Sequence, residues 1–477
     1  MDATLRALNG FGLGARPGER QRIGDPRAWL RAQLQGGAPV IAAPAEATPD
    51  AIRAALRAFR TAGQPQGNQD RAMARRDARR RLVEIEAVEG RAALAARATS
   101  SRPFVERLVA FWSNHLCVSV GAKALVAPLA GSYEREAIRP HVLGRFEDMV
   151  LASARHPAML AYLDNFQSVG PRSRGAQQGL ARRSAGGGVR PPRGLNENYA
   201  RELLELHTLG VDGGYTQQDV QELARMLTGW TVDGLRDGGA APRQGRGRAA
   251  MPADDSDAIG FAFQPALHEP GTKTLLGTRY EESGQAEGER AIRALCRHPA
   301  TARFVAGKLV AHFAGDAPAP GAVDRVAAVF RETDGNLRAV AGALIDLPDA
   351  WSDGARKFRT PQDWVVAVLR AFDAGTAADP LMPVLRQLRH PLWSPASPKG
   401  FGDSTQEWAD PDSLLNRAEL ARGIARRLRL QRVEPQHLLD VVDVPAGDPL
   451  PTLIADSSIA AEERIALALA GPAFQWR

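Results

Sequence analysis

Apolar residues recur along most of the chain at the three- and four-residue spacing of an amphipathic helix. In residues 103–116, Phe104, Leu108, Phe111 and His115 fall on one stripe, which predicts a helix with an aromatic end. The same pattern predicts further helices over residues 132–154, 157–165, 197–209, 217–228, 287–294, 301–313, 322–331, 337–346, 361–372 and 411–430. A highly charged stretch at 69–98 is expected to form a long, partly exposed helix.

Strand patterns are rare. The clearest is 259–263, which we expect to pair with 272–276 across the turn at 268–271. A parallel sheet would need repeated alternation of strands and helices, and we find none. The sequence therefore predicts an all-α protein, one large multi-helix domain over 1–477, with at most a small two-stranded ribbon near residues 259–276.

Two stretches are expected to be disordered insertions, at 171–194 and 233–257. Both are rich in glycine and arginine and poor in large apolar side chains, so they would bury too little apolar surface to offset the entropy of ordering.

The composition is that of a globular protein. The chain has 477 residues, 44% of them hydrophobic and 24% charged, which excludes a disordered or fibrous chain. The formal net charge is +7, from 61 Lys and Arg against 54 Asp and Glu. Only five of these cations are lysines and 56 are arginines. This skew is typical of a GC-rich genome, and because the excess charge is modest we do not expect nucleic-acid binding.

No targeting or redox signal is evident. No run of about 18 apolar residues occurs, so we expect no transmembrane helix. The first residues lack a charged region followed by an apolar stretch, which favours a cytoplasmic location. Cys117 and Cys296 are far apart in the sequence and are expected to be small buried hydrophobic residues.

Residues 195–232 hold the densest set of chemically capable side chains. Glu202 and Glu205 are three residues apart and share a helix face. His207 follows closely, but at 3.6 residues per turn it points about 200° away from Glu205 around the helix axis. Carboxylates with a nearby imidazole suit a divalent metal or acid–base catalysis. The alternative is structural: Arg201 and Glu205 are spaced as an ion pair, and Glu202 can pair with another arginine.

Other candidate residues lie apart from Glu202 and Glu205 in the sequence. Asn114 and His115 end the aromatic helix, and Trp230 follows the helix at 217–228. His268 lies in a turn before Lys273, where we expect it to be exposed. The glycine spacing around Lys273 is not that of a phosphate-binding loop.

The central motif resembles a known family. Residues 196–210 read NENYARELLELHTLG, and YTQQDV and ARMLTGW follow before residue 231. This pattern is similar to that of the bacterial domain of unknown function 1800 family. Further matches are Phe111-Trp112 with Asn114-His115, residues 156–165, residues 298–302 with Lys308, and residues 391–408.

The resemblance implies a largely helical protein without an established activity. Genes of the family often lie beside those of the domain of unknown function 1501 family, which is related to alkaline phosphatases and sulfatases. Many members carry export signals, so the resemblance also allows export. Two departures stand out: His268-Glu269 replaces the common His-Asp, and Gly400-Phe401 replaces the common Gly-Trp, which removes an N–H donor.

Our sequence-based hypothesis is a polar pocket in which distant motif residues meet. It assigns catalysis to Glu202, Glu205 and His207, substrate binding to Asn114, Trp230, His268 and Lys273, and a divalent metal to His115, His207, Glu202 and Glu205. The alternative is a helical scaffold that docks a partner of the domain of unknown function 1501 family and has no catalysis of its own.

Overall fold

The structure is a computed structural model that describes residues 2–62, 68–184, 194–233, 259–375, 379–428 and 433–477. These residues contain 24 α-helices and two two-stranded antiparallel sheets. The prediction of a mostly helical body is therefore confirmed. Within the described ranges, every helix is too short or too polar to cross a bilayer.

The α-helices have the following bounds in chain order. The first half of the chain forms α1 (Ala3–Leu5), α2 (Glu19–Arg22), α3 (Pro26–Gln33), α4 (Pro49–Thr61), α5 (Asn68–Thr99), α6 (Pro103–His115), α7 (Ala130–Tyr133), α8 (Phe146–Arg155), α9 (Pro157–Tyr162), α10 (Arg174–Ser184), α11 (Asn198–Glu202) and α12 (Gln217–Met226). The second half forms α13 (Gln285–Arg297), α14 (Pro299–Ala314), α15 (Pro320–Glu332), α16 (Leu337–Asp346), α17 (Pro361–Ala371), α18 (Met382–Gln387), α19 (Thr405–Trp408), α20 (Pro411–Arg427), α21 (His437–Val441), α22 (Leu450–Ala455), α23 (Ala461–Ala470) and α24 (Pro472–Gln475).

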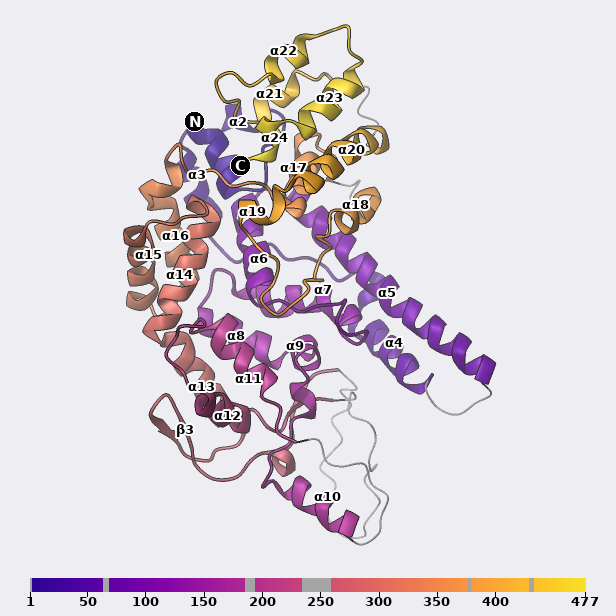
Figure 1. Cartoon of the computed structure of the whole chain (residues 1–477), viewed down its shortest axis with the longest axis vertical. Coiled ribbons are helices and arrows are strands. Elements are labelled where there is room, and N and C mark those ends of the chain that lie inside the picture. The colour runs from indigo at the N-terminus through magenta and orange to yellow at the C-terminus, as the bar shows by residue number, and fades with distance from the viewer. Residues whose placement is uncertain (1, 63–67, 185–193, 234–258, 376–378, 429–432) are drawn as a thin grey trace.

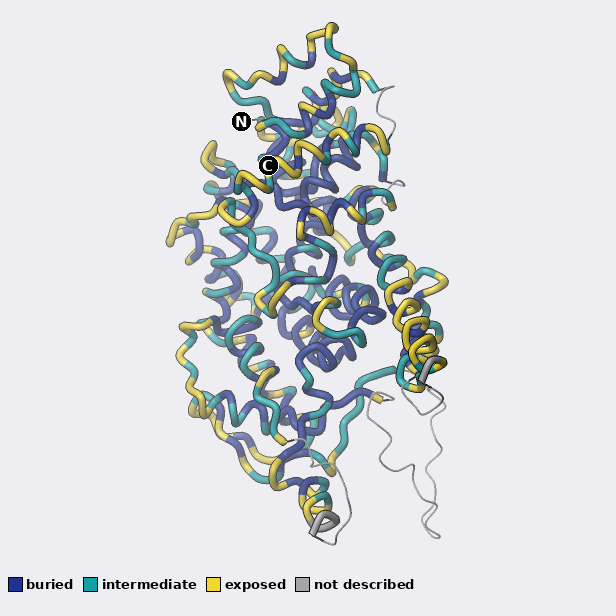
Figure 2. Tube along the Cα trace, turned by 45° about the vertical axis from the view of Figure 1, so that its right-hand side comes forward, coloured by how far each residue is buried: buried dark blue, intermediate teal, exposed yellow. Residues whose placement is uncertain are grey.

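Helix α6 runs through the middle of the molecule (Figure 1). Helices α14, α15 and α16 pack in a row along one side, and α17 to α24 form the end that also holds both chain termini. Helices α4 and α5 project together from the opposite side. The buried core follows the central elements, whereas the far end of α5 is exposed (Figure 2).

The charged stretch predicted as a long helix is α5, and its burial explains its composition. Ala78, Leu82 and Ile85 are buried on one side, whereas Arg75 and Arg79 are exposed. The helix is thus anchored by a narrow apolar stripe, and most of its arginines remain in water.

The predicted strand pairing is wrong. Strand β2 (Phe261–Phe263) pairs with β1 (Trp230–Val232), and β3 (Lys273–Leu275) pairs with β4 (Thr278–Tyr280). Leu276 and Gly277 have φ angles of 49° and 74°, as in the two-residue turns that close tight hairpins. This turn pairs β3 with the residues that follow it, whereas β2 pairs with β1.

The two predicted insertions are only partly described. Helix α10 occupies part of the first one, within residues 171–194. Residues 185–193 of this insertion and residues 234–257 of the second lie outside the described residues, so the prediction of disorder there stays a prediction.

Candidate functional site

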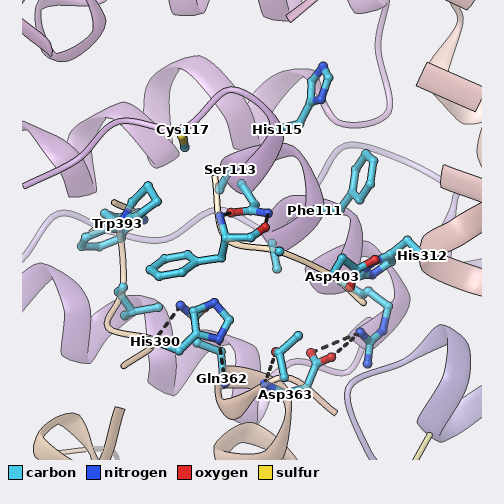
Figure 3. Close-up of a pocket in the computed structure, with 18 of the residues that line it drawn as sticks. Phe111, Ser113, His115, Cys117, His312, Gln362, Asp363, His390, Trp393 and Asp403 are labelled. Carbon is cyan, nitrogen blue, oxygen red and sulfur yellow. Dashed lines mark hydrogen bonds and ion pairs between the residues drawn. The ribbon is translucent and has the colours of Figure 1, made fainter. Parts of the chain in front are cut away.

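A cavity of about 260 Å³ lies where α6, α14 and α17 meet the loop that follows α18. Figure 3 shows it with part of its lining. The polar side chains in its wall are Arg97, Arg107, Ser113, Asn114, His115, Lys308, His312, Thr360, Gln362, Asp363, His390, Lys399, Asp403 and Glu407, and the large apolar ones are Phe111, Leu392, Trp393 and Phe401. The site therefore combines apolar walls with several charged groups, as small-molecule sites do.

Asn114 at the end of α6 holds one wall of the cavity in place. Its amide nitrogen donates to the carbonyl oxygen of Phe401, and its amide oxygen accepts from the Phe401 N–H, both at 2.8 Å. The preceding residue, Gly400, has a φ of 84°, and a Cβ there would lie 2.5 Å from the Asn114 carbonyl oxygen. The close approach of loop and helix therefore requires glycine at this position.

His312 and Asp403 form a hydrogen-bonded pair in the wall. The Nδ1 atom of His312, on α14, lies 2.9 Å from Oδ2 of Asp403. The Arg477 guanidinium lies 3.5 Å from Nε2 of the same ring. Because a guanidinium has no acceptor, Nε2 carries the lone pair and Nδ1–H donates to the carboxylate. Burial lowers the pKa of His312 to about 4, so the ring is neutral near pH 7.

The Asp403 carboxylate stays ionised although it is partly buried. Burial alone would raise its pKa, but His312 and the ammonium group of Lys357, 3.4 Å away, hold the pKa well below its usual value. Lys357 also contacts Asp316 at 2.6 Å. Lys357 thus connects the pair of His312 and Asp403 to a further carboxylate, that of Asp316.

Asp363 provides a second buried carboxylate at the start of α17. Thr360 caps this helix by accepting from the Asp363 N–H. Both carboxylate oxygens lie 3.1 Å from Nη1 of Arg107, and Oδ2 lies 3.1 Å from Nε of Arg477. These two arginines outweigh the effect of burial and hold the pKa of Asp363 well below its usual value.

His390 faces the cavity from the loop after α18. Its ring stacks on Trp408 with centroids 4.6 Å apart and contacts the edge of Phe401 at 4.2 Å. Its Nδ1 accepts from the backbone N–H of Gln362 at 3.5 Å, which assigns the ring proton to Nε2. Burial lowers the pKa of His390 to about 3, so it too is neutral near pH 7.

Lys308 and His115 connect the cavity to the motif segment. Nζ of Lys308 lies 3.0 Å from Nδ1 of His115, whose Nε2–H donates to the carbonyl oxygen of His207 at 3.1 Å. In Figure 3 the His115 ring points away from Gln362 and Asp363. The pKa of His115 lies well below its usual value because of burial and the nearby ammonium group.

The structure brings only some of the sequence-predicted residues to the cavity. Asn114 and His115 line it. His207 lies behind His115, fully buried, and its Nε2 has no hydrogen-bond partner among the described residues. Glu202 is partly buried and its pKa is raised by burial and by Glu205.

Glu205 takes part in a surface network rather than in the cavity wall. It accepts from the Tyr215 hydroxyl and lies 3.7 Å from Arg201. The ion pair between Arg201 and Glu205 is therefore confirmed.

The helix predicted over 197–209 is α-helical only as far as Glu202. It continues as a π-helical turn, Leu203–His207. The angle of about 200° between Glu205 and His207, which assumes 3.6 residues per turn, therefore does not apply here.

His268, Lys273 and Trp230 belong to a separate buried cluster near the two sheets. Glu287 is its centre: its carboxylate lies 3.0 Å from Nζ of Lys273 and 3.5 Å from Nε2 of His268. His268 is 6% exposed, so the expectation of an exposed turn is wrong. Trp230 is fully buried and lies against Gly288, where a Cβ would be 3.0 Å from the indole.

Among the described residues, no group of three or more His, Cys, Asp or Glu side chains is placed to hold a metal ion. The predicted metal ligands His115, His207, Glu202 and Glu205 therefore do not form such a group.

Sequence reasoning missed most of the cavity's ionisable residues. His312 and His390 carried no motif of their own, and Asp363 and Asp403 are separated from their partners by long stretches of chain. One signal was available: lysine is rare in this chain, and Lys308, Lys357 and Lys399 all lie in or beside the cavity.

Comparison with known proteins gives a family. The model of the family described as Protein of unknown function (DUF1800) matches residues 6–476, so the chain belongs to this family. None of the curated proteins and none of the solved structures compared with the chain matches it. The assignment thus rests on nearly the whole chain, and the chemistry has to be inferred from the site itself.

Proposed function

We propose that the cavity is an active site in which His312 exchanges a proton with a small bound molecule. The observation that carries this proposal is the pair of His312 and Asp403 in the wall of a 260 Å³ cavity. A carboxylate that accepts from Nδ1–H fixes the tautomer, so the lone pair lies on Nε2. Its contact with Arg477 is long, at 3.5 Å, and a bound molecule that gives a proton to Nε2 takes the place of this contact. The low pKa of His312 keeps the imidazole neutral and able to accept a proton near pH 7.

The rest of the lining suits a small molecule with both apolar and polar parts. Phe111, Trp393 and Phe401 offer apolar surface, whereas Lys308 and His390 offer polar contacts. Asp363 adds a fixed negative charge whose position is set by two arginines. Such preorganised charges favour a reaction in which charge develops on the bound molecule.

The test begins with a thermal-shift screen of small metabolites against the full chain. The compounds that bind are then assayed for conversion by mass spectrometry. We expect His312→Gln to lower turnover by about 10²–10⁴-fold, the usual contribution of a general base. His437→Gln is the matched control, because His437 is exposed and lies outside the cavity. Equal turnover in both variants would refute the proposal.

Glu202 and His207 support a further, separate proposal. We infer that they contribute to the same chemistry as acid–base groups, because the pKa of Glu202 is raised and the backbone carbonyl oxygen of His207 accepts from the cavity residue His115. Turnover by Glu202→Gln and His207→Ala tests this. Unchanged turnover in both variants would contradict it.

The alternative function is that of a scaffold for a phosphatase-like partner of the domain of unknown function 1501 family. It would be favoured if the chain co-purified with that partner in a stoichiometric complex, if no compound were turned over, and if His312→Gln changed nothing but stability.

A further inference from the structure

We propose that Lys308 forms an imine with a carbonyl group of the molecule bound in the cavity. The inference rests on the proposed function, because it uses the same cavity and the same bound molecule. It adds the substrate class, an aldehyde or ketone, and a covalent step.

The surroundings of Lys308 differ from those of the other four lysines. Lys123, Lys273 and Lys357 each contact a carboxylate, at 2.6 Å, 3.0 Å and 2.6 Å respectively. Lys399 is exposed. Lys308 is partly buried, and no carboxylate lies within 4.0 Å of its Nζ among the described residues. A shielded amine without a counter-ion is costly as an ammonium group, so its environment favours the neutral, nucleophilic form.

The contacts of Lys308 supply no counter-charge. Its Nζ donates to Nδ1 of His115 at 3.0 Å and lies 5.6 Å from the centre of the Phe304 ring. Neither neighbour carries a negative charge. Burial accordingly lowers the pKa of Lys308 to about 8, so a sizeable fraction of the amine is neutral slightly above neutral pH.

Lys308 and His312 lie on one face of α14. They are four residues apart, and both line the cavity together with Ala311. Side chains at this spacing are neighbours on a helix surface. A carbonyl compound in the cavity thus meets a nucleophilic amine and, one turn away, an imidazole that exchanges protons.

The chemical step balances without a further reagent. The Lys308 lone pair attacks the carbonyl carbon, and the C=O π pair moves onto oxygen. His312 transfers one proton from nitrogen to that oxygen, which gives a carbinolamine. His312 then transfers the second nitrogen proton to the hydroxyl group as the C–O bond breaks. Water leaves and a C=N bond remains. Lysine is suited to this step, whereas arginine stays charged and cannot form the imine.

The test is reductive trapping on the full chain. The protein is incubated with benzaldehyde, and in parallel with glyoxylate, in the presence of sodium cyanoborohydride, and the modified lysine is located by peptide mapping. Because the chain has only five lysines, each one can be followed. We expect Lys308 to be labelled at least about tenfold faster than Lys399, because its shielded site lowers its pKa.

Three variants provide controls. Lys308→Met and Lys308→Arg should lose the label, and the arginine variant keeps the positive charge, so it separates imine formation from simple charge recognition. Lys123→Met should leave labelling of Lys308 unchanged, because Lys123 lies outside the cavity and contacts Asp164. If the exposed Lys399 were modified before Lys308, the proposal would be overturned. The peptide map of the wild-type protein is sufficient for this comparison, even if a variant fails to fold.

The outcome also separates this inference from the proposed function. If Lys308 is not labelled but His312→Gln abolishes turnover, the imine is wrong and the proton-transfer site stands. If Lys308 is labelled at the same rate in His312→Gln and turnover is unchanged, the imine stands and the role of His312 is wrong.

Discussion

Replacing Asp363 with asparagine would remove the carboxylate charge that contacts both Arg107 and Arg477 in the wall of the cavity. The side chain keeps its size, so the change is mainly electrostatic. Both arginines are buried, with 2% and 5% of their surface exposed, and after the substitution they would face each other without that counter-charge.

The contact distances set the magnitude. Each arginine lies 3.1 Å from the carboxylate, and at an effective dielectric constant of about 20 each contact is worth about 5 kcal/mol before desolvation. Desolvation offsets much of this, and removing one partner of a buried pair typically costs about 3–5 kcal/mol. We expect Asp363→Asn to lie at the upper end of that range, because two cations lose their partner.

The assay is urea unfolding followed by tryptophan fluorescence and by far-ultraviolet circular dichroism, which must give the same midpoint for free energies to be compared. Asp324→Asn is the matched control. Asp324 contacts Arg303 at 2.6 Å, but both side chains are exposed, so its loss should cost less than about 1 kcal/mol.

The pH dependence gives a second check with a definite sign. The folded-state pKa of Asp363 lies below its unfolded-state value, so its stabilisation is present above about pH 3.9 and is lost as the pH falls below that. The difference between wild type and Asp363→Asn should therefore shrink in acid. Equal costs for Asp363→Asn and Asp324→Asn at pH 7 would refute the reasoning.

Three further predictions concern the cavity and the cysteines. Asn114→Ala removes both hydrogen bonds to the loop, so we expect a loss of about 1–3 kcal/mol and faster proteolysis of residues 395–404. His312 has a lowered folded-state pKa, so wild-type stability should fall as the pH drops from about 6.5 toward about 4, and His312→Gln should lessen this fall in urea titrations. Cys117 and Cys296 are buried with raised pKa values, so iodoacetamide should alkylate them only after unfolding, as mass spectrometry would show.

Helix positions could be predicted from the sequence because the signals are local. The capping box of Thr216 and Asp219 forms as the residue types require. His156 and His298, each followed by proline, cap α9 and α14 by accepting a backbone N–H at 3.1 Å and 3.2 Å. These contacts span two or three residues, so neighbouring sequence is sufficient to predict them.

Strand pairing and the candidate site depend on contacts that local patterns do not encode. Strand β2 offers apolar residues that could pair with several partners, and the turn at Leu276-Gly277 decides which remain available. His312 and Asp403 are 91 residues apart, and Arg107 and Asp363 are 256 apart. Only the packing of α6, α14 and α17 brings these groups together.

Lysine content illustrates how sequence and structure have to be combined. In a chain with 56 arginines, each lysine stands out, yet rarity alone does not separate Lys308 from Lys273 or Lys357. Those two occupy ion pairs in which a cation is the chemical requirement. Lys308 instead contacts an imidazole, and arginine there would supply charge but no nucleophile. Lys308 therefore differs from Lys273 and Lys357 in having no carboxylate beside it among the described residues. This difference depends on how the helices pack, so the sequence alone does not show it.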